Sequence, residues 1–272
     1  MKDYLVCIDS DGCAMDTMTV KHVECFGPCL IDEWNLEKWK DDILDKWNQI
    51  NLYTVTRGIN RFQGLKCILD IVDSQYTHIE GIKDLEEWLE GTPALSEKEL
   101  EAAIEGYPDK KMLKKALSWS RTVNRKIGLL PDECKAAFSG VECALKTIRE
   151  KADIAIVSSA NPSALKEEWN RCGLIPYVNY TMAQDMGTKD ACIISMISRG
   201  YKKEKIIMLG DAPGDCKAAK KAQVSFYPIL VNHEEQSWKE FTYRIFPEFV
   251  SGNYTEAKQE EQYQKFIDNL GN

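Results

Sequence analysis

The chain has 272 residues, a formal net charge of −8 at pH 7 and a hydrophobic residue content of 44%, which is enough apolar material for a substantial core. Proteins that bind the nucleic-acid backbone need a basic face, so this charge argues against a general nucleic-acid-binding protein. No stretch approaches the ~18 apolar residues of a membrane helix, and the first apolar run is too short for a signal peptide. We therefore expect a cytoplasmic protein without nucleic-acid or membrane partners.

The first predicted element is a short buried strand at residues 5–8, which is followed by Asp9, Ser10, Asp11 and Gly12. Open α/β sheets bind their ligands at the carboxyl ends of strands, which is where these carboxylates fall. Asp9 and Asp11 are two positions apart, so on an extended chain both side chains leave on one face. Their like charges then require a proton or a cation nearby. The alternative is an ordinary strand that ends in an Asp-Gly turn.

Residues 18–130 form a long block of amphipathic helical patterns without a convincing strand. Apolar residues recur at helical spacing over residues 33–50, 60–72, 85–89, 97–105 and 109–127. Ser96 with Glu99 three residues later forms a capping-box pattern for one of these helices. A helical block of this length, placed after a first strand, indicates an inserted domain.

Strand and helix patterns alternate from about residue 136 onward. Strands are predicted at four apolar runs, which are residues 153–157, 177–181, 205–209 and 224–230. Such alternation predicts an α/β fold with a doubly wound parallel sheet and helices on both faces. We therefore predict an α/β core formed by residues 1–17 and 131–272, with an all-helical domain at residues 18–130.

Polar residues follow the predicted strands of this core. Asp211 and Asp215 lie in the run of residues 210–215 that follows the strand at 205–209. Because parallel strands end at one edge of a sheet, these carboxylates should lie beside Asp9. Carboxylate oxygens are the ligands that Mg²⁺ prefers, so the three groups can form a cage for this ion.

Two further groups are candidates for binding an anion at the same edge. Ser158 follows the strand at 153–157 and can donate a hydroxyl hydrogen bond, and Lys189 precedes a predicted helix. Each residue also has an ordinary structural interpretation, because serine commonly caps helices, lysine is usually solvated and Asp215 can cap the helix that follows it. The order of the motifs and their common position after strands favour a site.

Together these motifs resemble those of the haloacid dehalogenase-like hydrolase superfamily, in its helical-capped phosphatase and β-phosphoglucomutase-like branch. Residues 8–12 are similar to the first motif, Ser158 to the second, Lys189 to the third and residues 210–215 to the fourth. Single short motifs are weak evidence, whereas four in this order are jointly specific. The resemblance implies a Rossmann-like core, and the helical block lies where this branch carries its cap domain.

The resemblance implies an Mg²⁺-dependent phosphohydrolase that acts on a small phosphorylated metabolite. Asp9 would be the nucleophile that forms an aspartyl-phosphate, and Asp11 the general acid and then the general base. The phosphoryl group would be bound by Ser158, Lys189, Gly12 and Ser159.

The resemblance also implies the metal ligands. Asp9 and Asp211 would bind Mg²⁺ through their side chains and Asp11 through its backbone carbonyl, whereas Asp215 would contact the metal through water. Dehalogenases of the superfamily lack the second carboxylate, and phosphonate-cleaving members use a lysine in the cap. The presence of Asp11 therefore favours hydrolysis of a C–O–P bond.

The chain departs from the family pattern at three positions. Cys13 and Asp190 replace the usual Thr or Val and the frequent Pro, and Gln223 replaces a Gly that often ends the helix after the fourth motif. None of these changes removes a reacting group.

Residues 56–64 contain two arginines, one asparagine and two glycines between predicted helices. The spacing of Gly58 and Arg61 resembles the substrate-specificity loop of helical-capped relatives. This resemblance implies that Arg57, Asn60 and Arg61 contact the substrate, since an arginine binds a carboxylate or a second phosphate bidentately. The alternative is that both arginines are surface residues near a helix start.

Two other functions remain open at this point. A phosphomutase would form the same aspartyl-phosphate but pass the phosphoryl group to a sugar hydroxyl. A catalytically silent binding protein would keep the fold without turnover. The sequence predicts neither the substrate nor the oligomeric state.

Overall fold

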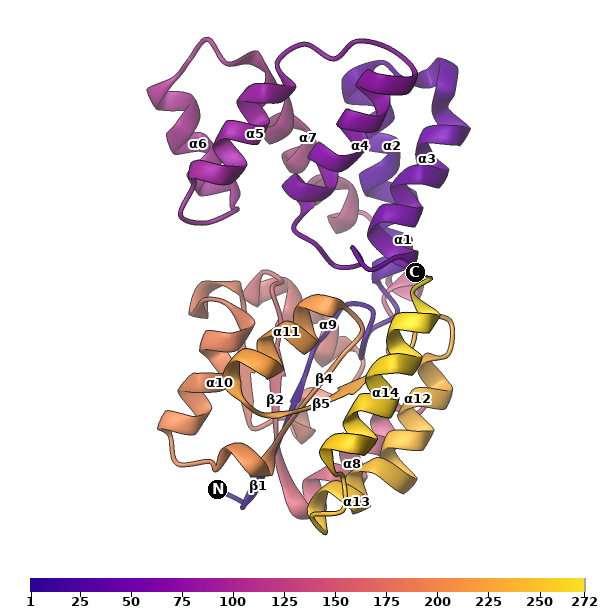
Figure 1. Cartoon of the computed structure of the whole chain (residues 1–272), viewed down its shortest axis with the longest axis vertical. Coiled ribbons are helices and arrows are strands. Elements are labelled where there is room, and N and C mark those ends of the chain that lie inside the picture. Colours follow the sequence, from indigo (N-terminus) through magenta and orange to yellow (C-terminus); the bar gives the residue numbers. More distant parts are fainter. Residues whose placement is uncertain (272) are drawn as a thin grey trace. The chain divides into compact units, whose positions relative to one another are not determined.

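The computed structural model describes residues 1–271, and the chain divides into two compact units. One unit, here called the core unit, consists of Met1–Met18 and the chain from Asp132 onward. The other, here called the helical unit, consists of Thr19–Pro131. Figure 1 shows the elements of both units in sequence colours.

The described residues of the core unit contain a five-stranded parallel sheet in the order β3-β2-β1-β4-β5. Its strands are β1 (Tyr4–Ile8), β2 (Ala152–Val157), β3 (Tyr180–Met182), β4 (Ile206–Gly210) and β5 (Ser225–Pro228). In the central strand, Ile8 is paired with Ile156 on one side and Leu209 on the other. Strands β1, β2 and β4 therefore end nearly level, so the residues that follow them meet at one edge.

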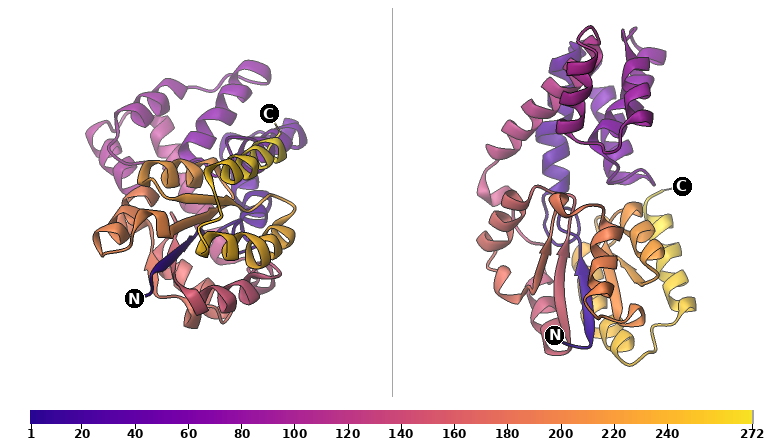
Figure 2. Two further views of the ribbon diagram at one scale, coloured as in Figure 1. Left: turned by 60° about the horizontal axis from the view of Figure 1, so that its bottom comes forward. Right: turned by 90° about the vertical axis from the view of Figure 1, so that its left-hand side faces the viewer.

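Helices cover both faces of this sheet (Figure 2). They are α8 (Val141–Lys151), α9 (Pro162–Arg171), α10 (Lys189–Ser198), α11 (Pro213–Ala222), α12 (Glu234–Glu240), α13 (Phe246–Val250) and α14 (Glu256–Asn269). Val6 and Ile8 pack with residues of α8, α9, α12 and α13. Leu5 and Cys7 pack with residues of α10, α11 and α14. This alternation along β1 is the period of two expected of a strand buried on both faces, and it confirms the predicted doubly wound α/β fold.

Two predicted strands differ from the observed ones by more than one residue at one end. The strand expected at 177–181 is β3, which begins at Tyr180, because Ile175–Tyr177 forms a 3₁₀ turn around Pro176. The strand expected at 224–230 is β5, which ends at Pro228. Proline lacks the N–H group that would continue a strand ladder, which is consistent with its position at the end of β5.

The helical unit begins within α1 (Met18–Lys21), whose first residue belongs to the core unit. Its other helices are α2 (Gly27–Trp34), α3 (Lys40–Asn48), α4 (Arg61–Gln75), α5 (Ile82–Gly91), α6 (Glu97–Gly106) and α7 (Lys111–Gly128). No strand occurs between residues 18 and 130, all of which the structure describes, and this confirms the prediction. The expected cap is also observed, since Ser96 Oγ accepts a hydrogen bond from the N–H of Glu99 at 3.3 Å. The unit has an apolar cluster of its own, which includes Trp47 and Trp119.

The prediction of a single helix over residues 33–50 is wrong. The helix α2 ends at Trp34, because Asn35 adopts the left-handed backbone conformation with φ of 56°. Asparagine tolerates this conformation better than most residues and commonly ends helices there. A 3₁₀ turn at Glu37–Trp39 then leads into α3. Across the described chain, none of the helices combines the length and apolar character of a membrane span.

Candidate active site

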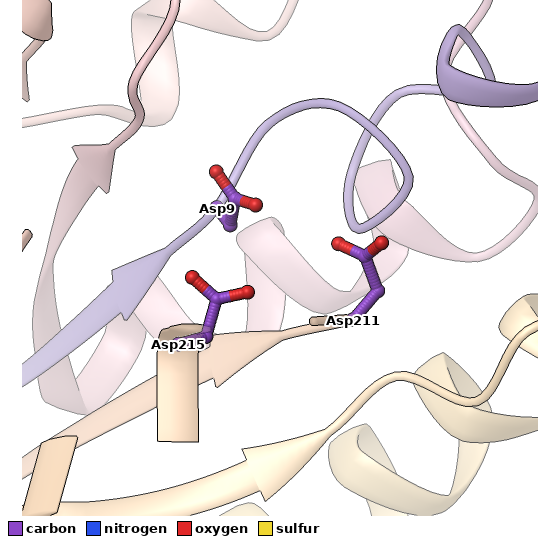
Figure 3. A group of neighbouring side chains, drawn as sticks. All are labelled: Asp9, Asp211 and Asp215. Atoms are coloured by element: carbon purple, nitrogen blue, oxygen red, sulfur yellow. The ribbon is translucent and has the colours of Figure 1, made fainter. Parts of the chain in front are cut away.

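Three buried carboxylates meet at the carboxyl edge of the core sheet (Figure 3). Asp9 follows β1, and its N–H donates to the carbonyl of Leu209 at 3.0 Å, which extends the pairing of β1 with β4 by one residue. Asp211 follows β4, and Asp215 lies in the first turn of α11. One carboxylate oxygen from each of the three residues lies within 4.8 Å of the others.

Gly210 provides the space for this arrangement. It is the last residue of β4, and a Cβ atom at this position would overlap the side chain of Asp215. Asp215 Oδ2 accepts a hydrogen bond from the N–H of Ala212 at 3.1 Å. A carboxylate in the first turn of a helix is favoured there by the helix dipole, so the sequence around α11 positions Asp215 beside β4.

Lys189 is the cation of this cluster. Its Nζ lies 2.9 Å from Asp9 Oδ2 and 2.5 Å from Asp215 Oδ1. Burial raises the pKa of Asp9 to about 7, the Lys189 ammonium opposes this rise, and the Asp215 carboxylate adds to it. Burial lowers the pKa of Lys189, but the two carboxylates more than offset this effect and raise it above its ordinary value. The two carboxylates therefore favour the charged form of Lys189, which lies between them.

The residues present fit a divalent metal ion. The group contains three carboxylates, and the Lys189 ammonium is paired with two of them, so the ionised group as a whole carries excess negative charge. The donors are all carboxylate oxygens, which suit Mg²⁺ better than the softer metals that prefer nitrogen or sulfur. Asp211 is 1% exposed and Asp9 is 6% exposed, so a cation would enter a largely dehydrated position. Asp9, Asp211 and Asp215 are therefore the residues that would hold the ion.

Among the described residues, the group of three clustered carboxylates does not include that of Asp11. The prediction that Asp9 and Asp11 leave one face assumes an extended chain, but β1 ends at Ile8 and the chain turns at Ser10. Gly12 has a φ of 79°, and its N–H donates to the carbonyl of Met15 at 2.9 Å.

The carboxylate of Asp11 is instead engaged by Thr17. The Thr17 hydroxyl donates to Asp11 Oδ1 at 2.5 Å, and Thr17 is fully buried. Sequence reasoning missed this partner. In the sequence, this bond is indicated only by a hydroxyl residue a few positions after the Asp-Gly pair. That residue can be recognised as a partner of Asp11 only when the course of the turn is known.

The residues expected to bind phosphate have different surroundings. Ser158 is buried, its N–H donates to the carbonyl of Met182 at 3.0 Å, and its Oγ accepts from the N–H of Ala160 at 3.2 Å. Accepting that bond leaves the Ser158 hydroxyl proton to be donated. Ser159 is exposed at the surface, and the N–H of Gly12 is used within the turn.

In the helical unit, Arg57 and Asn60 hold local structure together. Arg57 is 3% exposed and its Nη1 donates to the carbonyl of Leu52 at 2.8 Å, so the alternative that it is a surface residue is wrong. Asn60 caps α4 by accepting from the N–H of Phe62 at 2.9 Å, and its amide donates to the carbonyl of Leu95 at 2.9 Å.

Arg61 belongs to a polar cluster of the helical unit. Its Nη1 donates to Ser120 Oγ at 3.0 Å and to Asn124 Oδ1 at 2.8 Å, and Glu97 lies 3.9 Å away. The guanidinium also lies over the ring of Phe26, 5.0 Å from its centroid. Burial lowers the pKa of Arg61 and the Glu97 carboxylate opposes this, but arginine stays charged in proteins.

Comparison with known proteins identifies the family. Residues 69–229, more than half of the chain, match the family model for haloacid dehalogenase-like hydrolases. The chain therefore belongs to the haloacid dehalogenase-like hydrolase family, which confirms the resemblance seen in its motifs. No curated protein sequence matches the chain.

The chain is also similar to solved structures at low sequence identity. A haloacid dehalogenase-like hydrolase from Streptococcus pneumoniae is 11% identical, with a TM-score of 0.50 over 87% of this chain and 90% of that one. A Lactobacillus delbrueckii subsp. bulgaricus protein provisionally named phosphoglycolate phosphatase is 13% identical, with a TM-score of 0.53 over 84% and 86%. A Thermotoga maritima protein provisionally named β-phosphoglucomutase is 15% identical, with a TM-score of 0.48 over 83% and 84%.

Proposed function

We propose that the protein is an Mg²⁺-dependent phosphatase that hydrolyses a small phosphorylated metabolite through an aspartyl-phosphate intermediate. The observation that carries this proposal is the buried group of Asp9, Asp211 and Asp215 with Lys189 between two of its carboxylates. An anionic substrate requires positive charge at such a site, and a cation together with Lys189 would supply it. When bound, Mg²⁺ would stabilise the negative charge that develops on the phosphoryl oxygens.

Asp9 is the proposed nucleophile. Its backbone is fixed by the bond to Leu209, and Lys189 lies 2.9 Å from its Oδ2. In the first step, a carboxylate oxygen of Asp9 would form a bond to phosphorus while the bond from phosphorus to the leaving oxygen breaks. The Lys189 ammonium and the Ser158 hydroxyl would hold the phosphoryl oxygens during this transfer.

Asp11 is the proposed general acid and base. It would give its proton to the leaving oxygen in the first step and take a proton from the attacking water in the second. Water would then break the bond between Asp9 and phosphorus and release inorganic phosphate. The Thr17 hydroxyl donates to Asp11 Oδ1, and this bond would orient the carboxyl group for both proton transfers.

Substrate selection is assigned to the helical unit, as a cap domain. Arg61 is the candidate group for a second anion on the substrate, because its charge is presented by a fixed cluster with Ser120 and Asn124. Arg57 and Asn60 would support this segment through their bonds to backbone groups.

The test is a screen for phosphate release over a panel of phosphorylated metabolites and a generic aryl phosphate, with and without Mg²⁺. Asp9→Asn should abolish turnover while the protein stays folded. Asp153→Asn is the matched control, since Asp153 is also a buried aspartate of the core sheet but is bonded to Tyr201 and to the N–H of Lys2. Retention of the wild-type rate by Asp9→Asn would overturn the proposal. Activation by a sugar bisphosphate without phosphate release would instead indicate a phosphomutase.

A further inference from the structure

Asp11 is carried by a tight turn, here called the active-site turn, which comprises residues 10–15. The carbonyl of Ser10 accepts hydrogen bonds from the N–H groups of Cys13, Ala14 and Met15 at 3.3, 2.9 and 2.8 Å. The position of Asp11 therefore depends on how the backbone on either side of it is held.

Two buried tryptophans donate hydrogen bonds to residues of this turn that precede and follow Asp11 in the sequence. Trp169 Nε1 of α9 donates to Ser10 Oγ at 3.0 Å. Trp238 Nε1 of α12 donates to the carbonyl of Cys13 at 2.9 Å. Both indoles are fully buried in the apolar cluster that also contains Cys13. An indole has a single N–H donor, so each ring has its polar atom committed to the turn.

The position of Trp238 is itself well determined. The hydroxyl of Tyr227, in β5, donates to the carbonyl of Ser237 at 3.0 Å, and Ser237 Oγ accepts from the N–H of Leu230 at 3.0 Å. The ring of Trp238 also packs edge-on against Phe241, with centroids 6.3 Å apart. The helix α12 is thus tied to the end of β5, and it presents the indole N–H at a fixed place.

The helix α12 lies after residue 229, where the match to the family model ends. The segment that carries Trp238 is therefore outside the part of the chain that this model describes. A buried backbone carbonyl needs a hydrogen-bond donor, and the carbonyl of Cys13 receives one from this segment.

We infer that the indole N–H groups of Trp169 and Trp238 are positioning groups for Asp11, because they anchor the active-site turn at Ser10 and Cys13. The inference rests on the proposed function, in which Asp11 transfers the proton. Loss of either N–H removes one of the two indole anchors of the turn, and small displacements of a reacting group reduce rates strongly.

The experiment compares Trp238→Phe and Trp169→Phe with Tyr254→Phe. Tyr254 is the matched control, since it lies in the same apolar cluster as the two tryptophans and its hydroxyl also donates to a buried carbonyl, that of Phe226, at 2.9 Å. The tryptophan variants should lower kcat roughly tenfold with KM changed less than about twofold. Tyr254→Phe should lower the melting temperature but leave kcat unchanged.

A second readout separates positioning from a general loss of stability. If Asp11 is displaced, the tryptophan variants should lose more activity on alkyl phosphates than on aryl phosphates with acidic leaving groups, which need little proton donation. Equal losses on both substrate types, or an equal loss in Tyr254→Phe, would overturn the inference.

Amide hydrogen exchange tests whether the indoles hold the active-site turn, and this test does not require an active enzyme. The N–H groups of Cys13, Ala14 and Met15 should exchange faster in the tryptophan variants than in Tyr254→Phe, compared at equal distance below each melting temperature. If the wild-type protein releases no phosphate, the proposed function fails, and the exchange result alone decides whether the indoles hold the turn. Unchanged exchange at these amides would overturn the inference even in an active enzyme.

Discussion

The ammonium of Lys189 lies 2.9 Å from Oδ2 of Asp9, and the same nitrogen lies 2.5 Å from Oδ1 of Asp215. Asp9 and Asp215 are both buried, so a single cation compensates two charges that water hardly reaches. Removal of that cation leaves uncompensated carboxylates in a place of low dielectric constant. Loss of these two contacts should therefore affect both the free energy of unfolding and the catalytic rate.

Replacement of this cation is the first prediction. Lys189→Met should reduce kcat on an aryl phosphate by about 10²–10³-fold, because it removes a positive charge from the phosphoryl oxygens in the transition state. It should also lower the free energy of unfolding by about 3–5 kcal/mol without metal, since Asp9 and Asp215 lose their partner. Steady-state kinetics and urea unfolding measure the two effects.

Lys221→Met is the control for this change. Lys221 is on α11, and its side chain is 57% exposed. The kinetics of this variant should match those of the wild type. A Lys189→Met protein that turns over at the wild-type rate would show that the ammonium does not act on the phosphoryl group.

Metal binding should be visible in stability as well as in activity. A ligand that binds only the folded protein stabilises it by about 2.7 kcal/mol at a concentration 100 times its Kd, so Mg²⁺ should raise the melting temperature. Asp211→Asn should abolish this rise, because it removes one of three clustered carboxylates. Asp153→Asn should retain the rise, since its carboxylate is bonded to Tyr201. The same rise in all three proteins would place the metal elsewhere.

Substitution of the two glycines within the fourth motif, Gly210 and Gly214, should have opposite effects on the protein. Gly210→Ala should displace the side chain of Asp215, because the new Cβ would overlap it, and should therefore weaken Mg²⁺ binding and turnover by at least about tenfold. Gly214 lies in the first turn of α11, and a Cβ there would meet no described atom within 4 Å outside its chain neighbours and the backbone of its own helix. Gly214→Ala should keep activity and gain up to about 1 kcal/mol of stability from helix propensity. Magnesium titration and kinetics of both variants make the comparison.

Sequence patterns predicted the part of the site that depends on strand ends. Asp9 and Asp211 each follow a short apolar run, and parallel strands of similar length end at one edge of a sheet. The structure brings these residues together with Asp215, as that argument expects. Local pattern and topology are sufficient here because no side-chain detail is needed.

Other features depend on contacts that no local pattern encodes. Trp238 and Cys13 are 225 positions apart, and nothing in either segment indicates that one would bond to the other. The face on which Asp11 lies depends on where β1 ends, and an apolar run does not define that limit to one residue. The break at Asn35 depends on a backbone conformation that asparagine permits but does not require.

The bond from Thr17 to Asp11 should matter for proton transfer. Thr17→Val keeps the shape of the side chain but removes the hydroxyl that donates to Asp11 Oδ1 at 2.5 Å. A hydrogen bond to a charged group contributes about 1.5–3 kcal/mol, so kcat on alkyl phosphates should fall about 10–100-fold. Aryl phosphates with acidic leaving groups should be affected less. Thr17→Ser retains the hydroxyl and should restore most of the rate, and a Ser variant as slow as the Val variant would contradict the assignment.

Gln223 ends α11 in a conformation that glycine prefers. It adopts the left-handed backbone region with φ of 58°, at the position where the family often has glycine. For residues other than Gly and Asn, this backbone conformation costs about 1 kcal/mol or more. Gln223→Gly should therefore raise the free energy of unfolding by about 0.5–1 kcal/mol. The gain is reduced slightly because Lys203 Nζ loses its hydrogen bond to Gln223 Oε1. Gln223→Ala loses the same bond without relief of the backbone, so it should be no more stable than the wild type. Thermal unfolding of the three proteins tests the order, and a Gly variant no more stable than the Ala variant would show that the backbone conformation costs little here.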